Sequence, residues 1–387
     1  MKPPRNDSTQ SIQRGLRVGI LVPYDISEPG GGVKHHAFDL AASLRKMGDE
    51  VTILAPASAP IVDPNVIAFS GIVNVVSNGS DNKMAVFIPP WRVRKAIREL
   101  DLDILHVHEP LVPALTYWAS WFSPGVPKIA TFHCYAEDPP AALKAGHKVW
   151  GPTIFPLFRR GIAVSEAAAK YARIAWRDPL EIIGNGIDLR RFPVGLPIAA
   201  SKPLKLLFVG NRSDERKGFG TLLTSFRDLR SRGVPVTLHV VGGGAEMAAE
   251  EGLTDHGAVS FAQLVRHYQT CDVFVAPSLG QESFGIVLLE AMACARPIVC
   301  SDIEGYRAVA HRDGALLVPP RDVGALTSAI ESLVDDVDRR KQMSHANRRH
   351  AAAFDWNVLA PRIRRLYEEV IAEARGVTVE ALPMAAE

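Results

Sequence analysis

Short apolar segments alternate with amphipathic segments of helical period along most of this chain. The first apolar segment, LRVGILVPY at 16–24, has the β-branched character of a parallel strand that is buried on both faces. A helical pattern at 33–47 follows it, Gly48 ends that pattern, and a second strand pattern begins at 51. Further strand patterns at 103–110 and 128–135 extend the series, which predicts a parallel sheet with helices on its faces.

The same alternation starts again after a break. Residues 193–203 have the Pro, Gly, Ala and Ser composition of a linker, and new strand patterns then begin at 204, 236, 297 and 314. A renewed strand–helix series predicts a second doubly wound domain. We expect an α/β chain with two Rossmann-like domains and a terminal helix interrupted at Pro361, between two disordered tails, with these limits: 1–15 tail, 16–195 first domain, 203–355 second domain, 356–375 terminal helix, 376–387 tail.

One helical segment carries an acidic residue that its pattern does not explain. From Phe284 the chain is apolar on nearly every side, which predicts a helix packed inside the protein, yet Glu290 lies in its middle. A buried carboxylate needs a partner, and an arginine or a backbone amide would satisfy it as well as a ligand would. Glu282 precedes the helix by a distance that puts the two carboxylates about 12 Å apart, the length of a sugar joined through a diphosphate to a ribose. The N–H groups freed by Ser283 and Gly285 would hold the diphosphate, so the segment predicts a nucleotide-sugar site.

Two other segments offer candidate chemistry. Arg212, Arg216 and Lys217 stand before a helix expected near Gly218, where cations are unfavourable unless an anion binds there. The strand ends at 103–110 and 128–135 bring His106, His108, Glu109 and His133 to the edge of the first sheet where ligands bind. A metal site is conceivable from this H-x-H-E pattern, but no third ligand is evident in the sequence, so we expect no metal.

These motifs together resemble family-4 glycosyltransferases, which have the two-domain GT-B fold. ESFG with a second glutamate eight positions after the first, K-G at 217–218, TFH at 131–133 and NGID at 185–188 carry the resemblance. It implies that His133, Lys217 and Glu282 are catalytic, that the terminal helix crosses back to the first domain, and that transfer from the nucleotide sugar retains configuration without a cofactor or metal. The implied donor-binding residues are Gly31, Gly32, Arg212, Lys217, Glu282, Ser283, Phe284, Gly285 and Glu290. Asn211 stands where the family has its second diphosphate cation, so Arg212 takes that role or diphosphate binding is weaker.

Within this family the sequence looks most similar to phosphatidylinositol α-mannosyltransferases, which use GDP-mannose. PY at 23–24, the Gly-Gly-Val turn, the Asn-Gly-Ser loop at 78–80 and HEP at 108–110 carry that likeness. The implied acceptor-binding residues are Tyr24, Lys34, Asn78, Ser80 and Lys83. Lys34 replaces the usual Gln, and Lys83 and Ala85 fall where the family has lipid-phosphate arginines. A UDP-hexose-dependent transferase with a polysaccharide or small-molecule acceptor and a non-catalytic nucleotide-sugar-binding protein therefore remain open.

Composition and charge limit the classes of partner that the protein is expected to bind. A net charge of +2 gives no reason to expect nucleic-acid binding, and no run of eighteen apolar residues or signal-peptide core occurs. Trp91 adjoins a basic cluster that is either a solvated helix face or a patch for anionic lipid headgroups, formed by Arg92, Arg94, Lys95 and Arg98. A lipid acceptor would favour the second interpretation. We therefore expect a cytoplasmic protein whose membrane contact, where it occurs, is peripheral and on the inner face.

Overall fold

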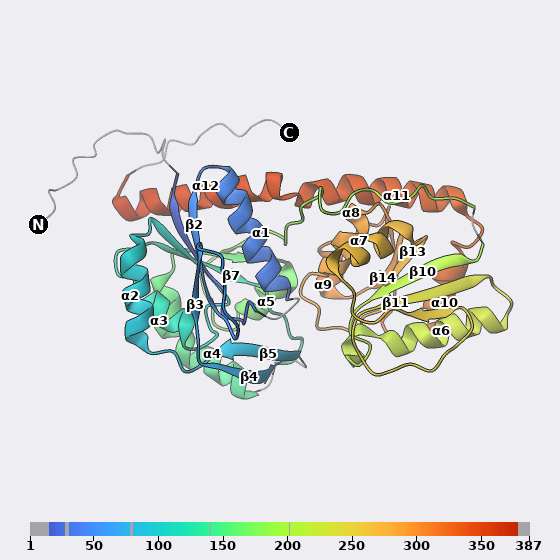
Figure 1. Cartoon of the computed structure of the whole chain (residues 1–387), viewed down its shortest axis with the longest axis horizontal. Helices are drawn as coiled ribbons and strands as arrows, with labels where there is room; N and C mark the ends of the chain where they lie inside the picture. The colour runs from blue at the N-terminus through green and yellow to red at the C-terminus, as the bar shows by residue number, and fades with distance from the viewer. Residues whose placement is uncertain (1–14, 28–30, 78–79, 140, 201, 378–387) are drawn as a thin grey trace, which may run out of the picture.

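The computed structural model describes residues 15–27, 31–77, 80–139, 141–200 and 202–377. It contains two units that follow one another in the chain, each built on an open parallel sheet with helices on both faces (Figure 1). Asn78 and both predicted disordered tails, apart from Gly15, Gly376 and Val377, lie outside the described residues.

The first unit has a seven-stranded sheet in the order β3-β2-β1-β6-β7-β8-β9, and all its strand pairs are parallel. The last four residues of the central strand β1 are fully enclosed, which is why the first apolar segment carries no alternation. The strands are β1 (Arg17–Leu21), β2 (Glu50–Pro56), β3 (Val66–Phe69), β6 (Ile104–His108), β7 (Lys128–Phe132), β8 (Arg160–Ala163) and β9 (Leu180–Ile182). The helices are α1 (Gly32–Lys46), α2 (Pro90–Leu100), α3 (Leu115–Trp121), α4 (Ala141–Ile154) and α5 (Glu166–Ala172), with the short turn η1 (Phe155–Leu157).

The second unit has a six-stranded parallel sheet in the order β12-β11-β10-β13-β14-β15. In both units the strand order reverses beside the first strand, so ligands are expected beyond the strand ends at that point. The strands are β10 (Leu204–Val209), β11 (Val236–Val241), β12 (Leu253–Asp255), β13 (Val273–Ala276), β14 (Ile298–Ser301) and β15 (Ala315–Val318). The helices are α6 (Phe219–Ser231), α7 (Phe261–Thr270), α8 (Ile286–Ala293), α9 (Glu304–Arg307), α10 (Val323–Glu331) and α11 (Val337–Ala351), with the short turns η2 (Glu215–Lys217) and η3 (Ala352–Phe354).

The terminal helix α12 (Trp356–Arg375) lies along the first unit, although it follows the second unit in the chain (Figure 1). Its buried face, which includes Leu359, Ile363 and Val370, packs in one apolar cluster with β1 and α1. The predicted interruption at Pro361 is wrong, because the helix continues through this residue. Pro361 is exposed in the second turn, where water can satisfy the carbonyl that loses its hydrogen bond.

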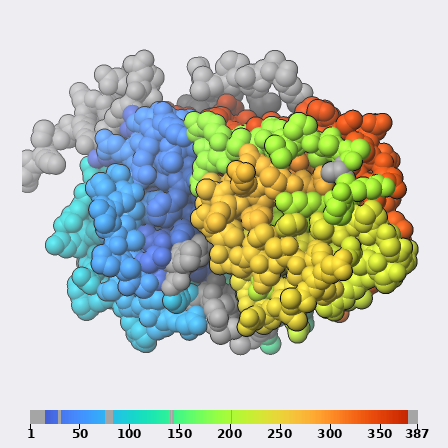
Figure 2. All heavy atoms as spheres, turned by 45° about the vertical axis from the view of Figure 1, so that its right-hand side comes forward, coloured from blue at the N-terminus to red at the C-terminus, as the bar shows by residue number. Residues whose placement is uncertain are grey.

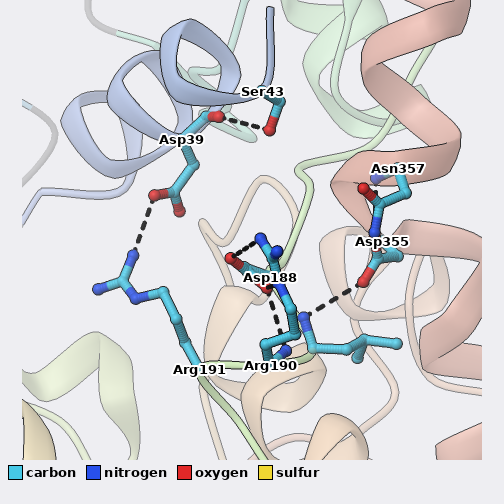
Figure 3. Close-up of polar contacts among 8 residues, drawn as sticks. Asp39, Ser43, Asp188, Arg190, Arg191, Asp355 and Asn357 are labelled. Atoms are coloured by element: carbon cyan, nitrogen blue, oxygen red, sulfur yellow. Dashed lines mark hydrogen bonds and ion pairs between the residues drawn. The ribbon is translucent and has the colours of Figure 1, made fainter. Parts of the chain in front are cut away.

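The start of α12 is tied to the segment that follows β9 (Figure 3). Asp355 caps the helix by accepting a hydrogen bond from the backbone N–H of Asn357 at 2.7 Å, and its other oxygen accepts one from Leu189 at 3.2 Å. Arg191 pairs with Asp39 of α1 at 2.9 Å. The segment after β9 is thereby tied both to the terminal helix and to the first unit.

Two further local predictions are corrected by the structure. The predicted Asn-Gly-Ser loop at 78–80 ends in a strand, since Ser80 begins β5 (Ser80–Ala85), which pairs antiparallel with β4 (Ile72–Ser77) in a sheet separate from the main ones. The apolar helix begins at Ile286 and not at Phe284, because Gly285 adopts the left-handed conformation at φ 86° and ends the preceding loop. None of the helices in the described part of the chain combines the length and hydropathy that crossing a bilayer requires.

Candidate functional site

The loop between β13 and α8 positions Glu282 beside a cation from another segment. The Glu282 carboxylate lies 2.5 Å from the Lys217 ammonium and 3.4 Å from the Ser278 hydroxyl, which itself lies 2.6 Å from the hydroxyl of Tyr306. The side chains of Glu282 and Lys217 keep 17% and 29% of their surface exposed. The ion pair is therefore held in place and still open to a ligand.

Two glycines let the segments that carry this ion pair approach closely. Gly218 separates η2 from α6 at φ 67°, and a Cβ there would lie 1.9 Å from the carbonyl oxygen of Pro277. Gly285 precedes α8, and a Cβ there would lie 2.6 Å from the Tyr306 ring. Because the chain passes so near at both points, Lys217 is brought beside Glu282 in the loop that precedes α8.

Glu290 finds its partner on a neighbouring helix. The hydroxyl of Tyr268 on α7 donates a hydrogen bond to Glu290 at 2.8 Å, and burial raises the pKa of Glu290 to about 7. The hydrogen bond from Tyr268 acts in the opposite direction but is weaker than the effect of burial. No sequence pattern pointed to this tyrosine, because it lies twenty-two positions away on a different element.

The other predicted cations of the second unit are engaged within the protein. The Arg212 guanidinium donates to the carbonyls of Gly242 and Ala245, each at 2.9 Å, and pairs with Asp255 at 2.9 Å. Only 7% of its side chain is exposed. Arg216 pairs with Asp214 at 2.7 Å. Arg212 therefore stabilises the 242–245 turn. Within the part of the chain that the structure describes, it does not lie beside Lys217.

The loop that carries Glu282 also touches the first unit. The Ser165 hydroxyl donates to the carbonyl of Ser283, and a Cβ at Gly184 would lie 2.8 Å from the buried ring of Phe284. Glu304 on α9 accepts a hydrogen bond from Tyr135 at 2.9 Å, just after the predicted His133 turn. Figure 2 shows the first unit, in blue, meeting the green-to-orange second unit along a long boundary. The Glu282 loop belongs to this boundary.

On the first unit, the His133 turn is built on a buried carboxylate. Glu109 accepts hydrogen bonds from the backbone N–H groups of His133 and of Cys134, the latter at 2.7 Å. The ring of His133 is buried, and its Nε2 lies 2.8 Å from Nδ1 of His108. Burial holds the pKa of both histidines well below the ordinary value, so both imidazoles are neutral near pH 7.

Two more buried histidines surround this pair. The ring nitrogens of His106 lie 2.7 Å from the Tyr367 hydroxyl of α12 and 2.6 Å from the Thr131 hydroxyl. His36 reaches the pair from α1, and burial lowers its pKa to about 4. The sequence analysis missed His36 because it lies in a helix some seventy residues before the H-x-H-E pattern, and only the fold brings it there.

The predicted acceptor residues that the structure describes gather at the same edge. The predicted donor-binding residues Gly31, at φ 95°, and Gly32 open α1, and the predicted acceptor residue Lys34 donates to the carbonyl of Ile26 at 3.1 Å. The Tyr24 hydroxyl lies 3.8 Å from the Cys134 sulfur, and the Lys83 carbonyl accepts from Asp25 at 2.7 Å. Ser80 begins β5, beside the undescribed Asn78.

The basic cluster forms the outer face of α2. Arg92, Arg94, Lys95 and Arg98 are exposed, whereas Val93, Ala96 and Ile97 face the core. Two aromatic residues near the start of this helix, Phe87 and Trp91, are also exposed, with 74% and 71% of their surface accessible. Large aromatic rings beside basic side chains are the features by which a helix binds the surface of an anionic membrane.

Comparisons with known proteins agree with this architecture. Residues 30–191 match the family model "Glycosyltransferase Family 4", and residues 203–336 match "Glycosyl transferases group 1". A phosphatidyl-myo-inositol mannosyltransferase of Mycobacterium leprae is 34% identical over 378 residues, covering 94% of this chain and all of that protein.

Solved structures show the same fold. A sucrose-phosphate synthase of Thermosynechococcus elongatus superposes with a TM-score of 0.69 at 20% identity, covering 92% of this chain and 99% of that one. HepE of Anabaena, solved with UDP and glucose, gives 0.70 at 16% identity over 91% and 99% of the chains. The predicted two-domain α/β fold is confirmed, and the chain belongs to the family-4 glycosyltransferases of GT-B fold.

Proposed function

We propose that this glycosyltransferase moves a hexosyl group, with mannose from GDP-mannose as the best candidate, onto a phosphatidylinositol-type lipid. The Lys217–Glu282 pair at the start of α8 carries the proposal, because it puts an accessible cation and a sugar-binding carboxylate side by side at the boundary of the two units. The relatives' name, phosphatidyl-myo-inositol mannosyltransferase, supports the choice of lipid and sugar.

In the proposed donor complex, the diphosphate lies at the N-terminus of α8 and the Lys217 ammonium exchanges part of its contact with Glu282 for a phosphate oxygen. The free N–H groups and the positive end of the helix dipole add to this charge, which stabilises the departing diphosphate. Glu282 then accepts hydrogen bonds from the sugar hydroxyls. Glu290, with Tyr268 fixing one oxygen, accepts from the ribose.

The first unit contributes a different chemistry to the proposal. His133 is neutral, so its imidazole can donate or accept a hydrogen bond beside the transferred sugar without adding charge. Retention implies attack from the side of the leaving group, and the diphosphate takes the proton of the acceptor hydroxyl. Tyr24, Lys34, Lys83 and the 78–80 loop would hold the headgroup, while the basic face of α2 binds the membrane that contains it.

Transfer to vesicles tests the proposal. Purified protein is mixed with phosphatidylinositol vesicles and GDP-mannose or UDP-glucose, and the labelled lipid product and free sugar are separated. We expect a mannolipid with GDP-mannose and none with UDP-glucose. Transfer from UDP-glucose, or to an added sugar in place of the lipid, would assign a different donor or acceptor and contradict the proposal.

The position of Arg212 favours a second candidate, a protein that binds a nucleotide sugar without transferring it. Asn211 occupies the place of the usual diphosphate cation, and Arg212 is engaged with the 242–245 turn and Asp255. Thermal stabilisation separates the candidates when it is measured with GDP, UDP, GDP-mannose and UDP-glucose beside a Glu290→Ala variant. Stabilisation that depends on Glu290, in a protein that transfers no sugar to any acceptor, would support the second candidate.

A further inference from the structure

Three imidazoles from separate elements converge in the interior of the first unit. His36 comes from the second turn of α1, His108 from the end of β6, and His133 from the turn after β7. All three are buried, and one candidate ligand atom from each lies within 4.8 Å of those of the other two.

The spacing of the rings matches three-histidine coordination. A tetrahedral ion with metal–nitrogen bonds of about 2.0–2.1 Å keeps the centroids of its imidazole ligands about 5 Å apart. The centroids of His36 and His108 lie 5.4 Å apart, those of His36 and His133 4.9 Å, and those of His108 and His133 5.1 Å. The backbone therefore holds the three rings at centroid separations that suit coordination, and rotation of the side chains would bring their ligand nitrogens, which lie within 4.8 Å of one another, around an ion.

Hydrogen bonding in this cluster is incomplete. Neither ring nitrogen of His36 makes a hydrogen bond of good geometry among the described residues, although the Asn185 side chain lies close enough to interact with this ring, and Nε2 of His108 has no partner there either. A buried polar atom without a hydrogen-bond partner is unfavourable, because it has lost its contacts with water and gained none in exchange. Asn185 faces His36 and His133, and its Oδ1 is also without a partner in the described part of the chain. His106 differs, because Tyr367 and Thr131 occupy both of its nitrogens.

We propose that His36, His108 and His133 bind a divalent transition-metal ion, with Zn²⁺ as the ion whose geometry and preference for imidazole they match. All three act as neutral ligands, so binding replaces the 2.8 Å contact between His108 and His133 with two metal–nitrogen bonds. The amide oxygen of Asn185 is placed to accept an N–H from a ligand ring and so to fix its orientation.

Ion binding also predicts an effect on transfer. Because His133 is the residue proposed to lie against the transferred sugar, an ion that holds its ring competes with that role, and Zn²⁺ should inhibit. This consequence rests on the proposed function. The binding of the ion does not, and its measurement needs neither donor nor acceptor.

Cobalt spectroscopy tests the site directly. The full-length protein is freed of metal with EDTA, dialysed, and titrated with Co²⁺, whose visible absorption reports tetrahedral nitrogen coordination. We expect one equivalent of Co²⁺ to bind with an intense band that Zn²⁺ abolishes. The His36→Gln and His108→Gln variants should each bind Co²⁺ at least tenfold more weakly.

A second histidine cluster provides the matched control. His239, His256 and His267 lie together in the second unit, where His239 and His256 are 3.0 Å apart. The His256→Gln variant should keep the band. Thermal melting in EDTA shows whether each variant folds. If only one of His36→Gln and His108→Gln folds, that variant is sufficient for the test. Absence of a band in the wild type, or a band lost in His256→Gln but kept in a folded variant of His36 or His108, would overturn the proposal.

Discussion

The two units meet at one boundary but contribute side chains of opposite character to it. The second unit presents an accessible ion pair, Lys217 with Glu282, and a carboxylate whose pKa burial raises to about 7. The first unit presents buried histidines whose pKa burial lowers, so that they are neutral. The difference shows how one fold can serve two substrates. Under the proposed function, the accessible charges of the second unit stabilise a diphosphate, whereas the neutral imidazoles of the first unit contact the transferred sugar without adding charge.

Removing the cation from the accessible pair should have the largest effect. We expect Lys217→Ala to lower kcat for sugar transfer by about 10²–10³-fold, the loss that follows when one group that stabilises developing charge is deleted. Initial rates of transfer measure it. The matched control is Lys341→Ala, which removes an exposed lysine paired with Asp338 on α11 and should leave kcat unchanged. A loss below tenfold for Lys217→Ala would show that the diphosphate binds elsewhere.

The buried histidines should make the first unit sensitive to acid. The unfolded chain protonates its histidines below about pH 6.5, whereas burial lowers the folded pKa of His36 to about 4 and that of His106 to about 3. Their contribution to stability is therefore constant above pH 6.5 and falls as pH decreases toward 4, by roughly 1.4 kcal/mol per pH unit for each histidine.

Tryptophan fluorescence during urea unfolding reads this effect selectively, because all six tryptophans lie between 91 and 176 or at 356, in the first unit and α12. His36→Gln should make the pH dependence shallower. His256→Gln, in the second unit, should leave the signal unchanged. If the free energy of unfolding depended on pH equally in the wild type and in His36→Gln, a neutral, buried His36 would be contradicted.

The contribution of Glu290 to stability should change with pH in the opposite direction to that of the buried histidines. Its folded pKa of about 7 exceeds the ordinary value, so its burial costs stability as pH rises from about 4.5 to 7. Accepting hydrogen bonds from a ribose requires the carboxylate, so we expect nucleotide affinity to fall below pH 7 by up to about tenfold per pH unit. Calorimetric titration at pH 6 and pH 8 measures this, and Glu290→Gln should bind weakly at both. A variant that kept the wild-type pH dependence would place the titrating group elsewhere.

The smallest expected effect concerns the outer surface of the first unit. Arg94→Ala should weaken binding to anionic vesicles by about fivefold, since one basic side chain near such a surface contributes about 1 kcal/mol. Cosedimentation with vesicles measures it, and the effect should disappear at high salt. Arg232→Ala, which removes an exposed arginine of the second unit, is the control. Equal losses in both variants would mean that α2 has no special part in membrane contact.

The local patterns that the sequence predicted well are those that depend on neighbours in the chain. The strand at 16–24 and the helix from 33 both appear, because burial on both faces and helical periodicity act over a few residues. The spacing of Glu282 and Glu290 and the K-G loop predict a donor site from the same kind of local pattern, and this site stays a prediction. The sequence analysis missed the hairpin of β4 and β5. Its polar residues lie outside the main sheet, so this segment lacks the pattern of buried residues by which the other strands were predicted.

By itself, the sequence determined the two-sheet α/β architecture and the residues that make up the motifs, because periodicity and motif spacing are properties of contiguous chain. Only the tertiary structure decided the partners of those residues. Close packing at Gly218 sets Lys217 against Glu282, the neighbouring helix α7 supplies Tyr268 to Glu290, and α1 brings His36 to His108 and His133. These contacts join residues up to about a hundred positions apart, and the free energy that selects them comes from burying whole elements against one another.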